Sequence, residues 1–466
     1  MAARSRDLNE GPVWRALLLM SGPMAFGIVA AISVGLVDSY FLARVGPEAL
    51  AAVGFVYPVI FAITSLSIGL SAGANAAISQ AIGGREAEDD VVRIGLHALT
   101  LGVGAGVAAS AAFLLVDRPL MRILGADGAV LDAALLYTSV WALSFPLLVG
   151  MMLVNAVFRA HGHGGRAAAI MVLSAAINVA ATPTLIFGWG PVPAMGVTGA
   201  ALATLLAQGA TCAVSALMAW RAGVLRTCGR PLHGFALSVQ RVGRVGGPAA
   251  LSNAIAPAGM AAVTAAVATL GAGAVGGFGA ATRVESLVAV PLLALSSGIG
   301  PVVGQAWGAG LRDRAATALR QSVLFALLYG LAVAVVLFVL ARPIAEAFGA
   351  GEASTAAAAG YLRVVGWSLF GYGMLVVGNA ALNAISAAGY ALAMSALRVL
   401  ALYLPLAWAG VWAFGYGGIL GAAVVANLFA AGAVLVTARA AGLDLFGLHA
   451  VRLVAGRLPG SRVPAA

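Results

Sequence analysis

The chain has 466 residues, of which 62% are hydrophobic and 9% are charged, and its formal net charge is +10. A soluble domain with a water-facing surface cannot sustain so few charged residues, so we predict that lipid covers most of the surface. All 26 basic residues are arginine, and the absence of lysine excludes a Walker A phosphate loop.

Apolar stretches of roughly 20 residues, the length that crosses a bilayer, follow one another from Trp14 to Arg439. We count twelve of them, and the first runs into Asp38 and Arg44 without a small-residue cleavage site, which indicates a retained helix and not a signal peptide. Arginines concentrate before the first stretch, in alternate loops, in the central loop and after the last stretch. The positive-inside rule therefore places both termini in the cytoplasm, in a multi-pass protein of the inner (cytoplasmic) membrane. Because topology accounts for these arginines, we predict no nucleic-acid partner.

The two halves of the chain repeat each other with an offset of about 225 residues. Pro23 falls on Pro248 and Gln80 on Gln305, each 225 positions apart. Each half holds six apolar stretches, an even number, so both repeats enter the membrane in the same direction. We predict an all-α integral membrane protein with twelve transmembrane helices in two parallel six-helix bundles. Its expected parts are an N-terminal lobe at 1–222, a cytoplasmic connecting loop at 223–240, a C-terminal lobe at 241–440 and a cytoplasmic tail at 441–466.

The first stretch carries a proline and an acid. Pro23 removes a backbone hydrogen bond, as does Pro183 in the fifth stretch, so we expect both to bend their helices. Asp38 lies fifteen residues past Pro23, about 22 Å along a helix and in the outer half of the span. A charge inside the membrane is costly and marks function by default, and a carboxylate in a poorly hydrated cleft can alternate between protonated and ionised forms. Two interpretations of Asp38 stay open, a proton-coupling group and an interfacial aspartate near the helix end.

The fifth and sixth stretches contain Asn178, Thr182 and Thr204. Asn178 and Thr182 are four residues apart and therefore share one helix face. We expect this polar network to hydrogen-bond Asp38 or a bound substrate. Ordinary hydrogen bonding between helices is the alternative.

A substrate cavity is expected between the two bundles. Met24 and Met151 offer adaptable apolar surface there, and Asn155 recurs in the second half as Asn379. Arg283 and Glu285 lie inside an apolar stretch and are assigned to the same cavity.

Arg283 and Glu285 are two residues apart, so they point to different faces of a helix and cannot simply neutralise each other. Arg283 either pairs with Asp38 across the cavity or closes the interface between the lobes.

Two other segments carry no functional prediction. His161 and His163 stand in a cytoplasmic loop without the further ligands that a metal site requires, so we predict no metal and no cofactor. Arg452 and Arg457 alternate with apolar residues from Leu443 to Leu458, which is typical of an amphipathic helix on the membrane surface.

Several motifs resemble the MATE (multidrug and toxic compound extrusion) family. The segment Val37–Gly54 is similar to the end of the first helix and the start of the second in that family. Gln80-Ala-Ile-Gly-Gly and Gln305-Ala-Trp-Gly-Ala-Gly resemble its paired glutamine–glycine turns, and Gly196–Thr204 looks like the start of its sixth helix. Arg283-Val-Glu-Ser-Leu is similar to the DNA-damage-inducible-protein-F-like branch. The resemblance covers almost the whole chain.

The resemblance implies a V-shaped, two-lobed transporter that exports amphipathic, often cationic, compounds in exchange for protons or sodium ions. In that branch the first-helix aspartate, here Asp38, is the coupling carboxylate, and the bent first helix corresponds to Pro23. The fifth-helix motif of the family often has an aspartate before the proline, whereas this chain has Thr182 before Pro183. That departure favours a single proton over sodium.

We therefore predict a proton-coupled multidrug antiporter that acts as a monomer in the lipid bilayer on small organic substrates. Sodium-coupled efflux and a lipid-linked saccharide flippase of the same superfamily are the alternatives, and the flippase predicts an arginine-rich cavity for phosphates. No enzymatic activity is predicted.

Overall fold

The computed structural model describes residues 6–226, 228–349 and 351–445. Within them, twelve helical spans are long and apolar enough to cross a membrane, which confirms the predicted fold class. The expected surface helix at 443–458 falls almost entirely on 446–466, and this part, like most of the expected tail at 441–466, lies outside the described residues.

The helices follow the two halves of the sequence. The first half contains α1 (Val13–Val45), α2 (Pro47–Gly83), α3 (Glu88–Ile123), α4 (Gly128–Trp141), the 3-10 turn η1 (Ala142–Ser144), α5 (Phe145–Ala160), α6 (Gly164–Phe187) and α7 (Gly196–Arg221). The second half contains α8 (Phe235–Ala268), α9 (Ala272–Val288), α10 (Val290–Gly308), α11 (Arg312–Glu346), α12 (Glu352–Val365), the 3-10 turn η2 (Gly366–Ser368), α13 (Leu369–Ala384), α14 (Ala388–Ala396), the π-helical segment η3 (Leu397–Tyr403), α15 (Leu404–Phe414) and α16 (Tyr416–Ala440).

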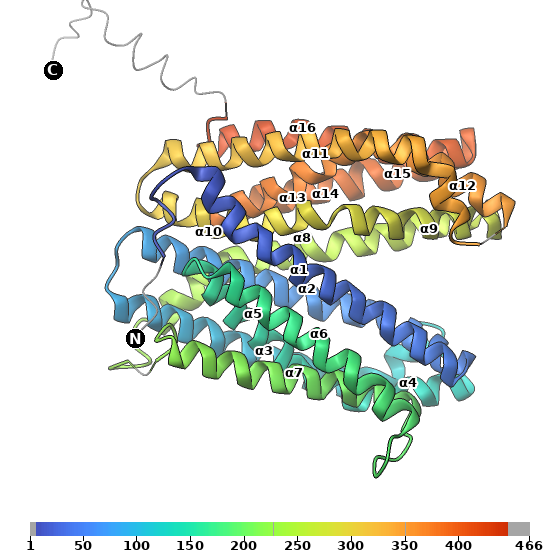
Figure 1. Cartoon of the computed structure of the whole chain (residues 1–466), viewed down its shortest axis with the longest axis horizontal. Helices are drawn as coiled ribbons and strands as arrows, with labels where there is room; N and C mark the ends of the chain where they lie inside the picture. Colours follow the sequence, from blue (N-terminus) through green and yellow to red (C-terminus); the bar gives the residue numbers. More distant parts are fainter. Residues whose placement is uncertain (1–5, 227, 350, 446–466) are drawn as a thin grey trace, which may run out of the picture.

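The helices form two layers, with α2 to α7 in one and α8 to α16 in the other, while α1 runs diagonally between them (Figure 1). α1 packs against α6 of the first layer and against α10 of the second. It continues as one helix through Pro23, as α6 does through Pro183. A single helix thus contacts both layers, which are called the first and second lobes below.

One boundary differs from the expectation. α8 begins at Phe235, so residues 235–240, which were expected in the connecting loop, are helical. Arginine is a good helix former, and Arg241 in the first turns of α8 lies 3.3 Å from Glu86. The basic composition that indicated a loop therefore continues into a helix.

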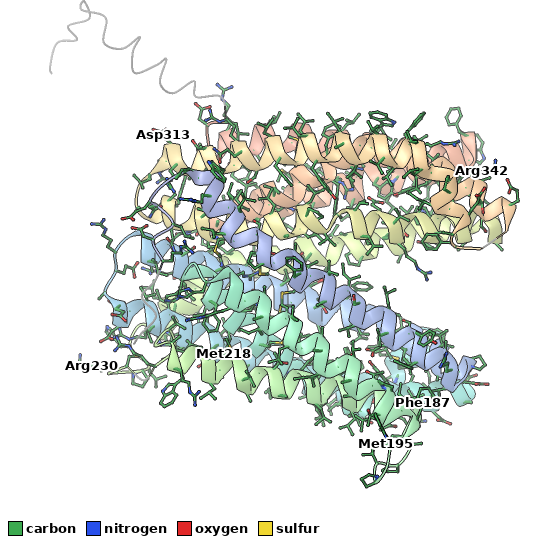
Figure 2. All side chains as sticks on the ribbon, in the orientation of Figure 1. Phe187, Met195, Met218, Arg230, Asp313 and Arg342 are labelled. Carbon is green, nitrogen blue, oxygen red and sulfur yellow. The ribbon has the colours of Figure 1, made fainter. Side chains whose placement is uncertain are left out.

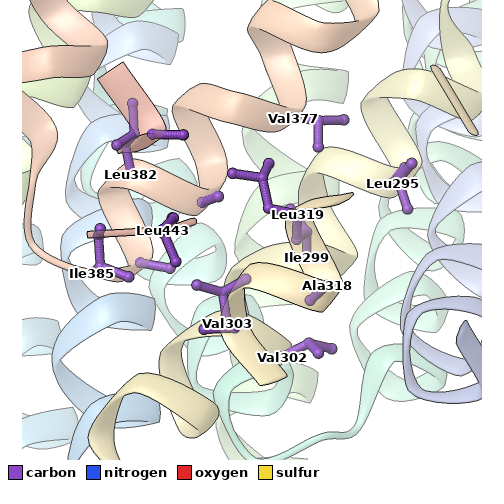
Figure 3. Packing of buried hydrophobic residues seen from close by; sticks show 14 of the residues in the cluster. Leu295, Ile299, Val302, Val303, Ala318, Leu319, Val377, Leu382, Ile385 and Leu443 are labelled. Carbon is purple, nitrogen blue, oxygen red and sulfur yellow. The ribbon is translucent and has the colours of Figure 1, made fainter. Parts of the chain in front are cut away.

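Alanines pack between larger apolar side chains inside each lobe, which allows the close helix approach that holds helices together in lipid. The buried cluster in Figure 3 joins α10, α11 and α13, with Ala318 and Leu319 of α11 facing Val302 and Val303 of α10. Arg230 and Asp313 lie at one end of the bundle, and Arg342 lies at the other (Figure 2).

The lobes are joined at one end by a pair of crossed hydrogen bonds. The side-chain amide of Gln80, on α2, donates to the carbonyl of Ala384 at 2.6 Å, and that of Gln305, on α10, donates to the carbonyl of Ala160 at 2.8 Å. The two glutamines are 225 residues apart, so the repeat relates one bond to the other. We call this end, where α1 begins and α16 ends, the closed end.

Two glycines allow the lobes to meet there. A Cβ atom on Gly83 would collide with the backbone carbonyl of Gln305, and one on Gly308 would collide with that of Gln80. These glycines are also 225 residues apart. Both sides of the closed end therefore use the same contact, with the two lobes exchanged.

The segment before α1 spans the closed end. The backbone N–H of Arg6 donates to the carbonyl of His161 in the first lobe, at 3.0 Å. The N–H of Leu8 donates to the side-chain oxygen of Gln305 in the second lobe, also at 3.0 Å. Arg314, on α11, donates to the carbonyls of Leu8 and Gly11. Residues 6–11 therefore contact both lobes.

Candidate functional site

A cavity of about 730 Å³ lies between the lobes. Its walls come from α1, α2, α4, α5, α6 and α7 on one side and from α8, α10, α13, α14 and η3 on the other. Asp38 lines the cavity near the C-terminal end of α1, away from the closed end. Arg159 lines it at the closed end, one residue before α5 ends. Most of the cavity wall is apolar, which suits organic molecules.

Asp38 belongs to a hydrogen-bonded chain of polar side chains. The hydroxyl of Thr182 lies 2.9 Å from a carboxylate oxygen of Asp38 and 3.4 Å from the side-chain oxygen of Asn178. The side-chain amide of Asn178 donates to the hydroxyl of Thr204 at 3.4 Å. Thr182 is fully buried, and Asp38 is half-buried at the cavity. The structure thus brings together the four polar residues singled out in the sequence, on α1, α6 and α7.

No ion pair involves Asp38 in the described parts of the chain. Its charge, when present, is stabilised by the hydrogen bond from the Thr182 hydroxyl. Thr182 occupies the position before Pro183 where the resemblance led us to look for an aspartate, and its hydroxyl bonds to the carboxylate that remains. A carboxylate held this way can gain or lose a proton without breaking a salt bridge.

Aromatic rings form the wall beside Asp38. Tyr57, Tyr137 and Trp141 line the cavity, and the rings of Tyr137 and Trp141 stack with centroids 6.1 Å apart. These three residues were not predicted, because a sequence does not distinguish an aromatic residue that lines a cavity from one in an ordinary core. They give the cavity a flat surface for planar ligands.

Three residues expected in the cavity line it, namely Met24, Met151 and Asn155. The Asn155 amide donates to the carbonyl of Ala167 at 2.8 Å, so it also ties α5 to α6.

Arg283 and Glu285 do not line the cavity, and their assignment to it was wrong. Arg283 is exposed on α9 and does not pair with Asp38, whose carboxylate is bonded by Thr182. Glu285 points into the second lobe, where the hydroxyl of Tyr361 donates to its carboxylate at 2.7 Å. Two residues two positions apart must point apart on a helix, and neither direction of α9 leads to the cavity.

Two arginines line the cavity instead, Arg159 on α5 and Arg398 on η3. Arg159 donates to the hydroxyl of Ser71 at 2.8 Å, and Arg398 donates to the side-chain oxygen of Asn427 at 2.7 Å. Neither arginine was among the residues predicted from the sequence to lie in the cavity. The cost of a charge inside an apolar stretch, which singled out Asp38, was the signal that would have found Arg398.

The loop after α5 holds the two histidines. His161 Nδ1 lies 2.8 Å from the carbonyl of Val157, and no group of three or more possible metal ligands gathers among the described residues. Burial lowers the pKa of His163 to about 4, and the charges of Arg166 and Arg6 act in the same direction. His163 is therefore neutral in the folded protein at physiological pH.

This depressed pKa predicts a pH-dependent stability. Below pH 6.5, where an unfolded histidine takes up a proton, the folded state binds fewer protons at His163, so folding stability falls as the pH drops toward 4. Replacing His163 with asparagine should make the melting temperature of the detergent-purified protein fall less between pH 7 and pH 5. Parallel curves for the two proteins would contradict this.

Comparisons with known proteins agree with the fold and the repeat. The family model described as MatE matches residues 23–184 and 248–409, two segments that start 225 residues apart and together cover more than half of the chain. A Shewanella oneidensis protein named "FAD transporter" is 33% identical over 423 residues, covering 90% of this chain and 93% of the relative. The "probable multidrug resistance protein YoeA" of Bacillus subtilis is 24% identical over 412 residues, covering 86% and 87%. A solved structure described as the outward-facing conformation of a multidrug resistance MATE family transporter superposes with a TM-score of 0.88 at 26% identity, covering 96% of this chain and 99% of that one.

Proposed function

Because this chain belongs to the MATE family of membrane transporters for small organic compounds, we propose that it is a secondary antiporter that exports amphipathic organic molecules in exchange for protons. The observation that carries the proposal is the chain of polar side chains from Asp38 through Thr182 and Asn178 to Thr204, whose two ends, Asp38 and Thr204, line the cavity. Asp38 is the acidic residue that lines this cavity.

Protonation of Asp38 would change the contact between α1 and the first lobe. The ionised carboxylate accepts the hydroxyl of Thr182, whereas a protonated carboxyl carries no charge and holds this bond less strongly. α1 also contacts α10 of the second lobe, and Pro23, which lacks a backbone N–H, allows it to bend. A shift of α1 would then reach both lobes. Rocking of the lobes about the cavity gives alternating access.

The closed end is proposed to face the cytoplasm, in the inner membrane, with both termini on that side. The density of arginine at this end supports this orientation through the positive-inside rule. With its cytoplasmic end closed, the cavity would be in the outward-facing state. Both walls of the site come from one chain, which supports a monomer as the working unit.

Proton coupling is favoured over sodium coupling because the cavity wall presents a single carboxylate. The decisive experiment measures the accumulation of a fluorescent cationic dye in proteoliposomes under proton and sodium gradients imposed separately. A proton gradient alone should drive accumulation, and a sodium gradient alone should not. Dye movement that follows only the sodium gradient, or neither gradient, would refute the proposal.

A second candidate concerns the substrate. The relative named FAD transporter is similar to 90% of this chain, which supports FAD or a related dinucleotide as the exported compound. The aromatic wall of Tyr57, Tyr137 and Trp141 would suit a flavin ring. Adding FAD to the same proteoliposomes tests this candidate, because a transported dinucleotide should compete with the dye.

A further inference from the structure

We infer that Arg159 and Arg398 supply anion-binding groups of the cavity, and that the protein also accepts organic anions in which a phosphate or carboxylate accompanies an aromatic ring. This inference deepens the proposed function and rests on its premise that the cavity carries the substrate.

The charge of the cavity wall is the first observation. Two arginines and one aspartate line the cavity, so its wall is net positive even when Asp38 is ionised. The protein therefore places more positive than negative charge where the substrate lies. A site built for cations alone would carry the opposite excess.

The two arginines lack the partners that normally accompany a buried guanidinium. The hydrogen-bond partners of Arg159 and Arg398 are the neutral side chains of Ser71 and Asn427. In the described residues no carboxylate lies within 4.0 Å of either guanidinium. The carboxylate of Glu285 is bonded to the hydroxyl of Tyr361 and forms no ion pair with Arg398. A charge without a nearby opposite charge is costly inside a membrane protein. An anionic ligand would therefore stabilise both arginines.

The donors of these arginines are only partly used. A guanidinium has five N–H groups in a fork that matches phosphate and carboxylate oxygens. The Nε atoms of both Arg159 and Arg398 are buried without a hydrogen-bond partner. The amide nitrogen of Asn75, which also lines the cavity, is buried and unpartnered as well. Three residues that line the cavity therefore each have a donor without an acceptor.

The backbone around Arg398 is unusual. Arg398 lies in the π-helical segment η3, a rare conformation that often marks functional sites. Asn427, which it contacts, is itself held by the hydroxyl of Ser368 at 2.9 Å. The guanidinium also lies over the ring of Tyr372, 5.6 Å from its centroid, and Tyr372 lines the cavity. The arginine is thus held in position beside an aromatic surface.

These anion-binding groups are separate from the proposed coupling group. Arg159 is one residue from the end of α5 at the closed end, and Arg398 is in the middle of the span from Ala388 to Phe414. Asp38 lies near the opposite end of α1. An anion can therefore bind while Asp38 is ionised, and coupling to the proton would pass through the movement of the lobes.

Flavins provide a matched set of probes, because riboflavin, FMN and FAD share one ring and differ in phosphate. Binding to the purified wild-type protein is measured by flavin fluorescence at fixed ionic strength. FMN and FAD should bind about tenfold or more tightly than riboflavin, as expected for charge-assisted hydrogen bonds. Inorganic phosphate should weaken FMN binding but not riboflavin binding. Equal affinities for the three flavins would overturn the inference.

Arginine variants assign the preference to these side chains. Arg159→Gln and Arg398→Gln should each reduce the preference for FMN over riboflavin about tenfold, while Arg159→Lys and Arg398→Lys, which keep the charge, should retain most of it. Arg283→Gln is the matched control, because Arg283 is an exposed arginine of a membrane helix away from the cavity. A loss of FMN and riboflavin affinity in equal proportion would show a merely structural role and overturn the inference.

A lipid headgroup is the other source of a phosphate, so the measurement is repeated in nanodiscs. FMN affinity should be the same in phosphatidylcholine and in phosphatidylglycerol discs. Displacement of FMN by phosphatidylglycerol would overturn the assignment to soluble anions. Proton-driven dye transport without any phosphate preference would overturn this inference and leave the proposed function standing. A phosphate preference without proton-driven transport would overturn the proposed proton coupling and leave the anion-binding groups standing.

Discussion

Replacing Asp38 with asparagine is expected to abolish proton-driven export while leaving the protein folded and able to bind substrate. Asparagine keeps the size of the side chain and can still accept the hydroxyl of Thr182, but it cannot exchange a proton. For one proton exchanged per dye cation, a proton-motive force of 100 mV imposed entirely as a pH difference contributes about 2.3 kcal/mol, which supports a substrate gradient of about fifty-fold. In the variant this gradient should collapse toward one, measured as steady-state dye accumulation in proteoliposomes.

Glu285→Gln is the control for this prediction. Glu285 is also a carboxylate inside an apolar stretch, but it faces Tyr361 in the second lobe and does not line the cavity. Glutamine can accept the same hydrogen bond, so export should persist. If Asp38→Asn retained the proton-driven gradient, coupling would not belong to Asp38 in the first lobe. If Glu285→Gln lost the gradient at the same time, coupling would belong to the second lobe.

The second large effect is expected at the closed end, where Gly83→Val should displace the protein from the state described above. The new side chain would collide with the backbone carbonyl of Gln305, which cannot move aside as a flexible side chain does. Overpacking of this kind costs about 1–3 kcal/mol, which shifts the balance between conformations by about 5- to 150-fold. The cavity would then spend less time closed at this end, and export should fall.

Distances between spin labels at position 85, after α2, and position 312, at the start of α11, would measure the separation of the lobes directly by electron paramagnetic resonance. Gly308→Val should act like Gly83→Val, because the repeat places Gly308 against the carbonyl of Gln80. Gly104→Val is the matched control, since a Cβ atom on Gly104 meets no neighbouring atom within 4 Å. Unchanged distances in both closed-end variants would show that these glycines do not control closure.

The fold was predictable because it follows from local features. Apolar length defines the spans, and the match of Gln80 with Gln305 defines the repeat, whose two halves the MatE matches confirm. The contact of Thr182 with both Asp38 and Asn178 was also within reach, since Asn178 and Thr182 share a helix face.

Other parts of the site could not be derived from the sequence. Helices in lipid are apolar on most sides, so the pattern does not show which face of α9 meets the cavity, and Arg283 and Glu285 were misplaced for that reason. The bond from Gln80 to Ala384 joins residues 304 positions apart in different lobes, and its existence depends on how the lobes are tilted. Arg398 is different, because a charged residue inside an apolar stretch is visible in the sequence. It could have been predicted in the same way as Asp38.

The short segment at residues 6–11 has a practical consequence. Because it bonds to His161 in one lobe and to Gln305 and Arg314 in the other, it must lose one set of partners whenever the lobes part at that end. An environment-sensitive dye attached at position 10 would therefore change its emission with each turnover. The segment offers a site for an optical sensor of the transport cycle that leaves every membrane helix unmodified.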